Sequence, residues 1–212
     1  MIYEFITENV KPGKLGEVEE RFAKAYEHRK QLSTLAAFWR VDIGPLNQII
    51  HIWPYQDMQE RERIHAEIGK SADYSSQLDE FLMSRHSEIM LAAPFSPALK
   101  VARMGPYFEI RTYTMAPDAL SNVLENWEHS LPTRAAISPL VGLFHSQPGG
   151  SNKLLHIWAY PSMDEREQAP TQAKASGAWP PSVLAAKEGR PSIPYLEQES
   201  KIVKPAKFSP LQ

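Results

Sequence analysis

One short stretch of this 212-residue chain occurs twice. Residues 49–62 read IIHIWPYQDMQERE and residues 154–167 read LLHIWAYPSMDERE, with eight of the fourteen positions identical. At the same offset of 105 residues the two halves align without a gap over about 75 residues. Because a long internal repeat indicates that each copy is one structural unit, we expect two domains, residues 1–104 and residues 105–212.

Both copies predict the same first four elements. Alternating apolar residues predict an opening strand, a stripe at spacings of three and four predicts a helix, and two β-rich runs joined by GPLN or GGSN predict a hairpin. In the first copy these elements are residues 2–8, 15–26, 35–43 and 48–55, and in the second copy 107–115, 120–131, 140–147 and 153–160.

A second helix and a last strand complete each copy. Asp57 with Glu60, and Ser162 with Glu165, fit the capping box that begins a helix. Gly69 in the first copy, and Pro170 and Pro180-Pro181 in the second, predict that this helix is broken into two pieces. Residues 86–92 and 199–204 predict the last strand. The order β-α-β-β-α-β is that of a ferredoxin-like unit, so the fold class is α+β.

The repeated strand has two different faces, since successive side chains of a strand point to opposite sides. In the first copy His51, Trp53 and Tyr55 share one face, and Ile50 and Ile52 share the other. We expect the helices to cover the aliphatic face. Two exposed aromatic faces would form an unusually large patch, so we predict that they meet and close an α/β barrel.

Several motifs of the chain resemble those of a known family. YFEIRTYTMAP (107–117), DIGPLNQIIHIWPY (42–55), the ERE that follows each repeated strand, and FSP at 95–97 and 208–210 are similar to the NIPSNAP family of the dimeric α/β-barrel superfamily. The resemblance covers nearly the whole chain and implies a tandem member of uncharacterised biochemical function. The superfamily includes cofactor-free monooxygenases, isomerases, ligand-binding regulators and haem-binding relatives, so the fold does not decide the function.

The repeated strand supplies the first candidate site. Its six side chains are His51, Trp53, Tyr55, His156, Trp158 and Tyr160. An imidazole titrates near neutral pH, which makes the two His candidate acid/base catalysts. The Tyr hydroxyls would donate to a developing oxyanion, and the Trp rings would stack on a flat substrate. In the alternative interpretation these residues only pack the two sheets together.

A second candidate site lies on the opening strand of the second copy. Arg111, beside Glu109 and Tyr113, would anchor a carboxylate or phenolate substrate, or else form a salt bridge inside the barrel. The first copy has Ile6 and Glu8 at the positions of Arg111 and Tyr113, so a site built on this Arg would exist in one copy only.

Other polar residues are weaker candidates. Arg40 is a candidate ligand contact, although a pair with Asp42 inside the barrel is the favoured interpretation, and His145, which aligns with Arg40, is a candidate proton shuttle. Arg61 and Arg166 in the ERE motifs predict surface or capping ion pairs on a helix. The Phe of each FSP segment is expected to dock in a groove as packing.

The composition of the chain argues against several classes of binding partner. A net charge of −2 disfavours nucleic acid and anionic membranes. The chain has no Cys, no apparent leader and no apolar run long enough to span a bilayer, from which we expect a cytoplasmic protein. No metal site is predicted, because Glu62 and His65 have no matching pair in the second copy. No cofactor is expected either, and haem is a weak alternative by analogy with distant superfamily members.

Two functional hypotheses follow. The first is a barrel that binds a small organic molecule, with a second copy of the chain as a further possible partner. The alternative is a cofactor-independent monooxygenase or isomerase that acts on a small aromatic or polyketide-like acid. The second copy also carries eight extra residues near 188–195, EGRPSIPY, which predict either a lid or a surface decoration.

Overall fold

The computed structural model describes residues 1–70, 78–147 and 152–212 and divides into two compact units. Unit 1 consists of residues 1–91, 99–103 and 202–212, and unit 2 of residues 92–98 and 104–201. Each unit therefore contains most of one repeat together with the end of the other. Within the described ranges, no helix combines the length and the apolar character that a membrane crossing requires.

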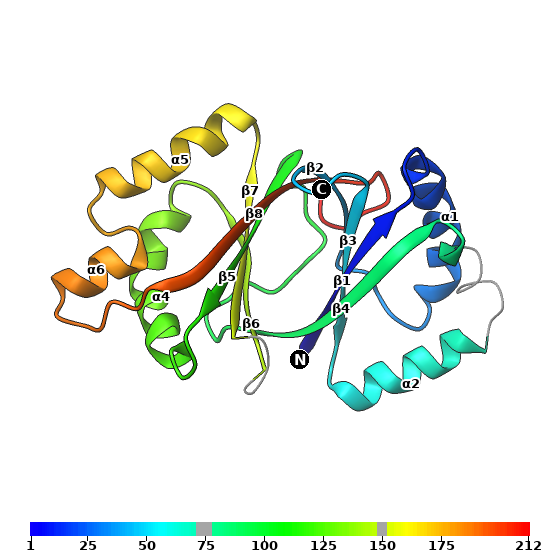
Figure 1. Ribbon diagram of the computed structural model, residues 1–212, viewed down its shortest axis with the longest axis horizontal. Helices are drawn as coiled ribbons and strands as arrows, with labels where there is room; N and C mark the ends of the chain where they lie inside the picture. Colours follow the sequence, from blue (N-terminus) through cyan, green and yellow to red (C-terminus); the bar gives the residue numbers. More distant parts are fainter. Residues whose placement is uncertain (71–77, 148–151) are drawn as a thin grey trace. The chain divides into compact units, whose positions relative to one another are not determined.

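Unit 1 has the predicted ferredoxin-like order of elements (Figure 1). Its strands lie in the order β4-β1-β3-β2 with antiparallel neighbours, and the final residues of β8 pair with β2. The elements are β1 (Ile2–Val10), α1 (Leu15–Arg29), β2 (Ala37–Ile43), β3 (Gln48–Tyr55), α2 (Met58–Gly69) and β4 (Leu82–Ala92).

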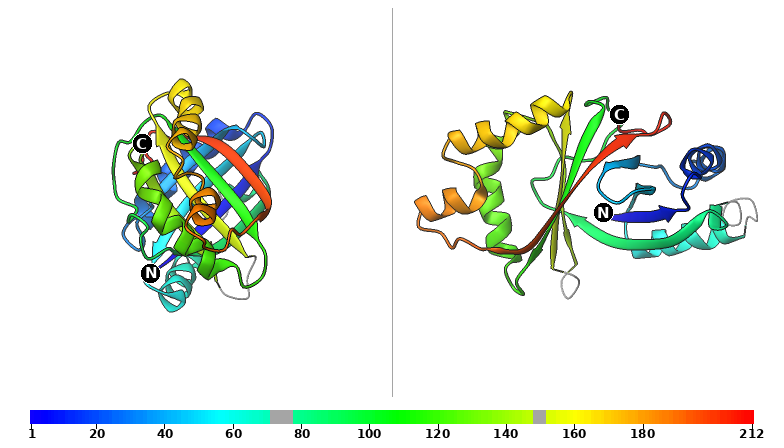
Figure 2. Two further views of the ribbon diagram at one scale, coloured as in Figure 1. Left: turned by 90° about the vertical axis from the view of Figure 1, so that its left-hand side faces the viewer. Right: turned by 45° about the horizontal axis from the view of Figure 1, so that its top comes forward.

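Unit 2 repeats this arrangement with the strand order β8-β5-β7-β6. Its helices gather on one face of the strands, as the two views in Figure 2 show. The elements are β5 (Tyr107–Met115), α4 (Leu120–Ala135), β6 (Leu140–Ser146), β7 (Lys153–Tyr160), α5 (Met163–Ala175), α6 (Pro181–Lys187) and β8 (Tyr195–Pro205). The prediction of an α+β fold with two ferredoxin-like units is confirmed.

The hairpin turns have left-handed Asn residues at equivalent positions. Asn47 and Asn152 have φ angles of 55° and 50°, a region that Asn tolerates better than most residues. The carbonyl of Asn47 accepts a hydrogen bond from the amide of Val10 at 2.8 Å. Most of the GGSN turn predicted at 149–152 lies outside the described residues.

The second helices begin as predicted. The Asp57 side chain accepts a hydrogen bond from the amide of Glu60 at 2.9 Å, and Ser162 Oγ accepts one from Glu165 at 3.2 Å. In unit 1, α2 ends at Gly69. The second piece expected after it falls partly on residues 71–77, outside the described residues.

The break in the second helix of unit 2 is not at Pro170. Helix α5 continues through Pro170 to Ala175, and α6 begins at Pro181. A proline in a helix removes only one backbone donor. Burial of Ala169 and Ala173, one turn apart on the same face, keeps this segment helical and packed against the sheet. Of the two predicted break positions, Pro170 was wrong and Pro180-Pro181 is confirmed, since α6 begins at Pro181.

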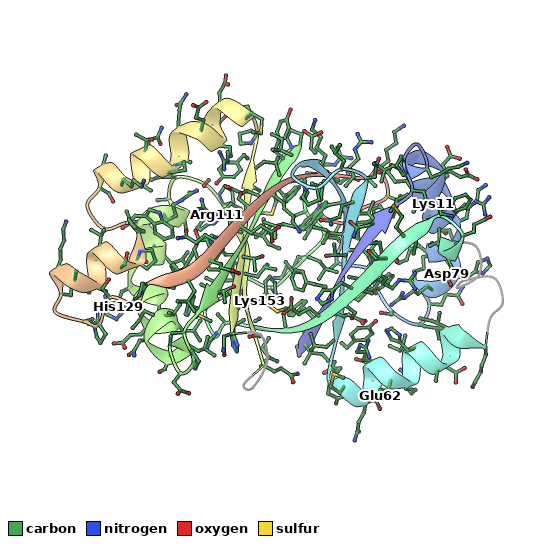
Figure 3. All side chains as sticks on the ribbon, viewed as in Figure 1. Lys11, Glu62, Asp79, Arg111, His129 and Lys153 are labelled. Atoms are coloured by element: carbon green, nitrogen blue, oxygen red, sulfur yellow. The ribbon has the colours of Figure 1, made fainter. Side chains whose placement is uncertain are left out.

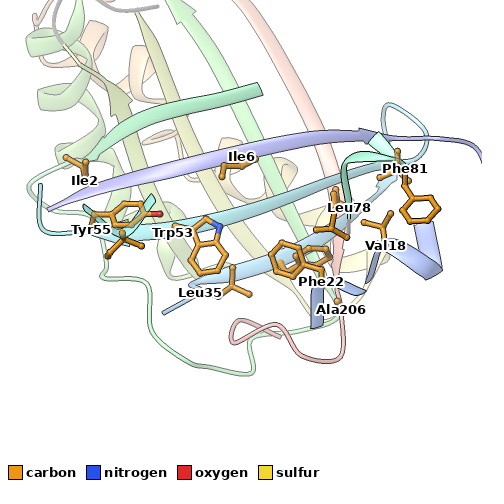
Figure 4. Close-up of a cluster of buried hydrophobic side chains, with 14 residues drawn as sticks. Ile2, Ile6, Val18, Phe22, Leu35, Trp53, Tyr55, Leu78, Phe81 and Ala206 are labelled. Atoms are coloured by element: carbon orange, nitrogen blue, oxygen red, sulfur yellow. The ribbon is translucent and has the colours of Figure 1, made fainter. Parts of the chain in front are cut away.

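The helices cover the aromatic face of the repeated strand, not the aliphatic face. Phe22 of α1 lies 5.0 Å from the His51 ring and 6.3 Å from the Trp53 ring, measured between ring centroids, and Figure 4 shows Trp53 and Tyr55 in the same core cluster as Phe22. The predicted assignment of the two faces was wrong. Ile50 and Ile52 are only 4% and 0% exposed, so both faces of β3 are buried and apolar character does not distinguish them.

The two FSP segments dock as predicted. In unit 1 the ring of Phe208 lies 4.8 Å from that of Phe38, and Ser209 Oγ accepts a hydrogen bond from the amide of Phe38 at 3.0 Å. In unit 2 Ser96 Oγ accepts one from the amide of Leu143 at 2.8 Å. Each segment ends one repeat and docks in the unit that consists mainly of the other repeat.

Candidate functional site

Each repeated strand holds a buried Trp–His pair. The indole N–H of Trp53 donates to His51 Nδ1 at 2.7 Å, and that of Trp158 donates to His156 Nδ1 at 2.7 Å. An indole nitrogen is a donor only, so Nδ1 of each ring is the acceptor and the proton of the neutral ring is on Nε2. Burial lowers the pKa of both His, which favours the neutral ring.

A buried carboxylate anchors the end of each repeated strand. Glu109 is 1% exposed and accepts hydrogen bonds from Arg166 Nη2 at 2.6 Å, Ser200 Oγ at 2.7 Å and the Tyr160 hydroxyl at 3.2 Å. Burial alone would raise the pKa of Glu109, but the bonds from Arg166 and Ser200 hold it below its ordinary value. These contacts occupy the Tyr160 hydroxyl, which is therefore part of a structural network.

Unit 1 contains the same network. Glu4, also 1% exposed, accepts hydrogen bonds from Arg61, from Ser87 Oγ at 2.6 Å and from the Tyr55 hydroxyl at 3.3 Å, and His65 Nε2 lies 3.0 Å away. The Arg of each ERE motif thus binds a buried carboxylate on the sheet. The prediction of surface or capping pairs for Arg61 and Arg166 was wrong.

The first helix of each unit contributes an Arg that the sequence analysis missed. The guanidinium carbon of Arg29 lies 3.4 Å from the centre of the Trp53 ring, and that of Arg134 lies 4.2 Å from the Trp158 ring. Each guanidinium also donates to the Tyr at the end of the strand, at 2.9 Å for Tyr55 and 2.8 Å for Tyr160. The available signal was the alignment of the two Arg at the repeat offset.

A pocket of about 280 Å³ lies in unit 2 between the sheet and the helices. Its floor includes Arg111 and His156, which are direct cross-strand partners on β5 and β7. Its walls are mainly aromatic and its rim carries the exposed Lys174. Figure 3 labels Arg111 on β5. The aromatic lining residues are Tyr113, Trp127, Trp158, Trp179 and Tyr195.

Two buried donors of this pocket have no hydrogen-bond partner among the described residues. They are Nε2 of His156, a residue that is 1% exposed, and Nε of Arg111. Burial is the main cause that lowers the pKa of His156 well below its ordinary value, and the positive charges of Arg111 and Arg134 add to it. Both donors would be satisfied by a negatively charged acceptor in the pocket.

Unit 1 has an equivalent pocket of about 210 Å³ with different polar groups. Ile6 replaces Arg111 as the cross-strand partner of the His, here His51. Glu8 stands at the position of Tyr113, and its Oε2 lies 3.6 Å from His51 Nε2. Its Oε1 accepts a hydrogen bond from Arg85 Nε at 2.6 Å. This pocket therefore contains a carboxylate of the protein itself.

The extra residues of the second repeat pack against α4, and one of them, Tyr195, lines the unit 2 pocket. Asn126 of α4 donates to the carbonyl of Pro191 at 2.8 Å and accepts a hydrogen bond from Arg190. The Tyr195 hydroxyl accepts a hydrogen bond from the indole of Trp127 at 2.9 Å, and its ring is part of the pocket wall. The insertion is thus a fixed part of the pocket.

Five predicted site residues do not line these two pockets: Trp53, Tyr55 and Tyr160, whose contacts are given above, and Arg40 and His145. Arg40 is half exposed, with Nη1 4.0 Å from Glu19, and Asp42 pairs with Lys204 at 3.0 Å, so the predicted Arg40–Asp42 pair does not form. The last four residues of β2 are exposed or partly exposed, which lets both charges reach other partners. His145 is buried, but its Nδ1 lies 2.9 Å from the carbonyl of Ser146.

The pocket residues do not fit a haem. A His that ligates a metal through Nε2 normally donates its Nδ1–H to a neighbour, whereas Nδ1 of His156 accepts from Trp158 and Nε2 carries the proton. In the described part of the chain, no group of three or more His, Asp or Glu side chains is placed to hold a metal ion.

The fold and the paired pockets define a class of protein. It is an α+β chain of two ferredoxin-like repeats, each with a buried Trp–His pair beneath its helices. The chain belongs to the NIPSNAP family, whose family model matches residues 3–97 and again residues 108–210. The resemblance found in the sequence is confirmed.

Similar proteins are known from animals. Protein NipSnap of Drosophila melanogaster is 27% identical over 222 residues, an alignment that covers 100% of this chain and 79% of the relative. Protein NipSnap homolog 3A of Homo sapiens is 28% identical over 223 residues, covering 100% of this chain and 86% of the relative.

Two solved structures share the fold over nearly the whole chain. A protein from Fusobacterium nucleatum described as a "putative monooxygenase" has a TM-score of 0.67 and 11% identity, and covers 97% of this chain and 92% of its own. A protein of the same description from Lactobacillus acidophilus has a TM-score of 0.66 and 8% identity, with coverage of 95% and 92%. At these identities the likeness shows the fold alone.

Proposed function

We propose that unit 2 binds a small organic anion in the pocket between its sheet and its helices. The observation that carries this proposal is the buried Nε2–H of His156, which has no partner among the described residues. A buried donor without an acceptor is costly. An anionic acceptor would satisfy this donor together with Arg111, which lies directly across the sheet.

The walls of the pocket favour a flat molecule. The rings of Trp127 and Trp179 lie 5.2 Å apart and nearly perpendicular, and Tyr195 closes another side. Aromatic walls with a few polar groups at one end are typical of pockets for small organic ligands, and a volume of about 280 Å³ suits a single small molecule. We therefore expect an aromatic ring with one negatively charged group.

The catalytic alternative has weaker support from this geometry. A cofactor-independent monooxygenase or isomerase would need His156 as a proton acceptor. Its Nδ1 already accepts from Trp158 and its Nε2 carries the proton, so the ring cannot take a proton without losing that hydrogen bond. Binding through the Nε2–H is the simpler role for this residue.

Titration with benzoate, followed by tryptophan fluorescence, tests the proposal. We expect the Arg111→Ile variant, which introduces the residue of unit 1, to bind benzoate about 10–100-fold more weakly, because one charge-assisted hydrogen bond contributes about 1.5–3 kcal/mol. The exposed Arg63 provides the matched control, and Arg63→Ile should bind like the wild type. Equal affinities for all three proteins, or no saturable binding, would contradict the proposal.

Two further predictions concern the cellular location of the chain and its association with a second copy of itself. The cytoplasmic location expected from the sequence can be checked by fractionating cells that express the full chain. Association of the chain with a second copy can be checked by light scattering of the purified protein, with and without benzoate.

A further inference from the structure

The two pockets differ most at one pair of equivalent positions. Glu8 of β1 and Tyr113 of β5 align at the repeat offset, and both lie on the face of the sheet that carries the His. Glu8 is 1% exposed, which is unusual for a carboxylate unless positive groups surround it.

The Glu8 carboxylate is placed where a bound anion would be expected. One oxygen lies 3.6 Å from His51 Nε2, an electrostatic contact longer than a hydrogen bond, and the other accepts a hydrogen bond of 2.6 Å from Arg85 Nε. Burial alone would raise the pKa of Glu8, but His51 and Arg85 outweigh it and lower this pKa to about 2. Glu8 is therefore ionised at neutral pH and gives His51 a negative neighbour.

Unit 2 has the same donor without this neighbour. Tyr113 replaces Glu8, and its ring packs 4.9 Å from the His156 ring, edge to face. Gln198 replaces Arg85, and the cation comes instead from Arg111. Among the described residues that line the unit 2 pocket, the one carboxylate is Glu109, which Arg166 and Ser200 already bind. Arg111 Nη1 also lies 3.8 Å from Glu109, the internal ion pair that the sequence allowed, while Arg111 Nε has no partner among the described residues.

We infer that Glu8 is a built-in carboxylate ligand of the unit 1 pocket, and that the anion bound by unit 2 is a carboxylate that takes the corresponding role. The second part of this inference rests on the function proposed above. Unit 1 is then a pocket occupied by its own side chain, and unit 2 is the pocket that accepts a free ligand.

The donor set explains the choice of a carboxylate. Apart from the Arg that stacks on the Trp, each pocket is lined by one further guanidinium, Arg85 or Arg111, and by the imidazole of its Trp–His pair; His65 also lines the unit 1 pocket. In unit 1 the two oxygens of Glu8 face His51 and Arg85, one each. A carboxylate has two oxygens and matches these two donors. A phosphate group carries a third oxygen and a second charge, for which the described lining of unit 2 shows no additional buried donor without a partner.

Replacement of Glu8 by alanine tests the first part. The experiment compares Glu8→Ala/Arg111→Ile with Arg111→Ile, so that the unit 2 site is disabled in both proteins. We expect acetate to raise the Tm of the double variant by about 2–4 °C relative to chloride at equal ionic strength, because a ligand that binds the folded state stabilises it. Acetamide should have no effect. A Tm that is the same in acetate and chloride would overturn the inference.

A second variant keeps the test decisive if Glu8→Ala does not fold. Glu8→Gln keeps the shape of the side chain and removes the charge. Its Tm should be lower than that of the wild type and should not respond to acetate, because the amide still fills the space. A Glu8→Gln protein as stable as the wild type would show that the charge of Glu8 is not needed, and would overturn the inference.

A comparison of four probes on the wild type tests the second part. We expect benzoate to bind at least about 10-fold more tightly than phenyl phosphate, benzenesulfonate or benzamide, the difference expected for one charge-assisted contact. Tighter binding of phenyl phosphate would overturn the carboxylate assignment and leave the proposed function intact. Absence of binding by all three anions would refute the proposed function, while acetate rescue of Glu8→Ala would still establish the role of Glu8.

Discussion

A single buried carboxylate connects three elements in each unit. Glu4 of β1 binds Arg61 of α2, Ser87 of β4 and the hydroxyl of Tyr55 on β3. Glu109 has the same role in unit 2. Removal of one partner from a buried ion pair leaves the other charge uncompensated, so these two residues should be among the most sensitive positions of the chain.

We predict that Glu4→Gln lowers the free energy of unfolding by about 3–5 kcal/mol, the usual cost of breaking a buried ion pair. Urea denaturation at neutral pH measures this change. The exposed Glu62 of α2, labelled in Figure 3, provides the control, and Glu62→Gln should stay within about 0.5 kcal/mol of the wild type. A Glu4→Gln protein with the stability of the control would contradict the assigned role.

The same variant should change the dependence of stability on pH. Burial raises the pKa of Glu4, but hydrogen bonds from His65, Arg61 and Ser87 outweigh it and leave this pKa well below its ordinary value. The stabilisation is therefore complete above about pH 4.5 and is lost as the pH falls toward the pKa of the folded state. Wild-type stability should fall more steeply below pH 4.5 than that of Glu4→Gln.

At the residue scale the sequence indicated some site residues and not others. His156 and Trp158 were predicted because they share one face of a strand that occurs twice, and Arg111 because it lies on one strand face with Glu109. These three residues do meet in one pocket. Arg29 and Arg134 were not predicted, because an Arg near the end of a helix is usually exposed. Only the tertiary contact with a Trp ring shows that these two are buried.

At the scale of elements, the insertion of the second repeat contributes one wall of the unit 2 pocket. Asn126 on α4 holds it by hydrogen bonds to Pro191 and Arg190, and Tyr195 at its end contributes a wall. Unit 1 has Arg21 at the position of Asn126 and no corresponding insertion. The insertion is therefore part of what makes unit 2 suited to a ligand.

We predict that Asn126→Ala weakens benzoate binding on the order of fivefold, since loss of about 1 kcal/mol of hydrogen bonding lets the insertion move away from the pocket. Fluorescence titration measures the change. Ser121→Ala, on an exposed position of the same helix, should have no effect. Unchanged affinity in Asn126→Ala would mean that the insertion is a decoration, as the sequence alone allowed.

The sequence was enough to predict which segments are helices and which are strands. It was not enough to predict which face of each sheet the helices cover. The period of two in β3 and β7 and the capping residues Asp57 and Ser162 are local signals, and both were confirmed. Which face a helix covers depends on contacts distant in sequence, such as that between Phe22 and His51. With both faces buried, hydrophobic character carried no information about this choice.

For the whole molecule, duplication gives two pockets that share one set of buried structural residues, called the frame below, and differ in the residues that line them. The Trp–His pair, the Arg that stacks on the Trp and the buried Glu–Arg pair are present in both units. The frame fixes the position and the tautomer of the His. The lining then decides whether the partner of the His comes from the protein or from solution.

Because the two units share the frame and differ in the pocket lining, we predict that unit 1 can be converted into a binding site by changing its lining. In the triple variant Ile6→Arg, Glu8→Tyr and Arg85→Gln, the three positions carry the residues of unit 2. The new Arg would lie directly across from His51, and the internal carboxylate would be gone. We expect the number of benzoate molecules bound per chain to rise from one to two, as measured by isothermal titration calorimetry.

The single variant Ile6→Arg is the matched control for this conversion. It adds the cation while Glu8 still supplies the negative charge next to His51, so the number of benzoate molecules should stay at one. If the triple variant also binds one molecule while it remains folded, the three lining residues do not account for the difference between the units. The insertion that carries Tyr195 in unit 2 would then be the next difference to transfer, because no aromatic residue at a corresponding place is found among the described residues that line the unit 1 pocket.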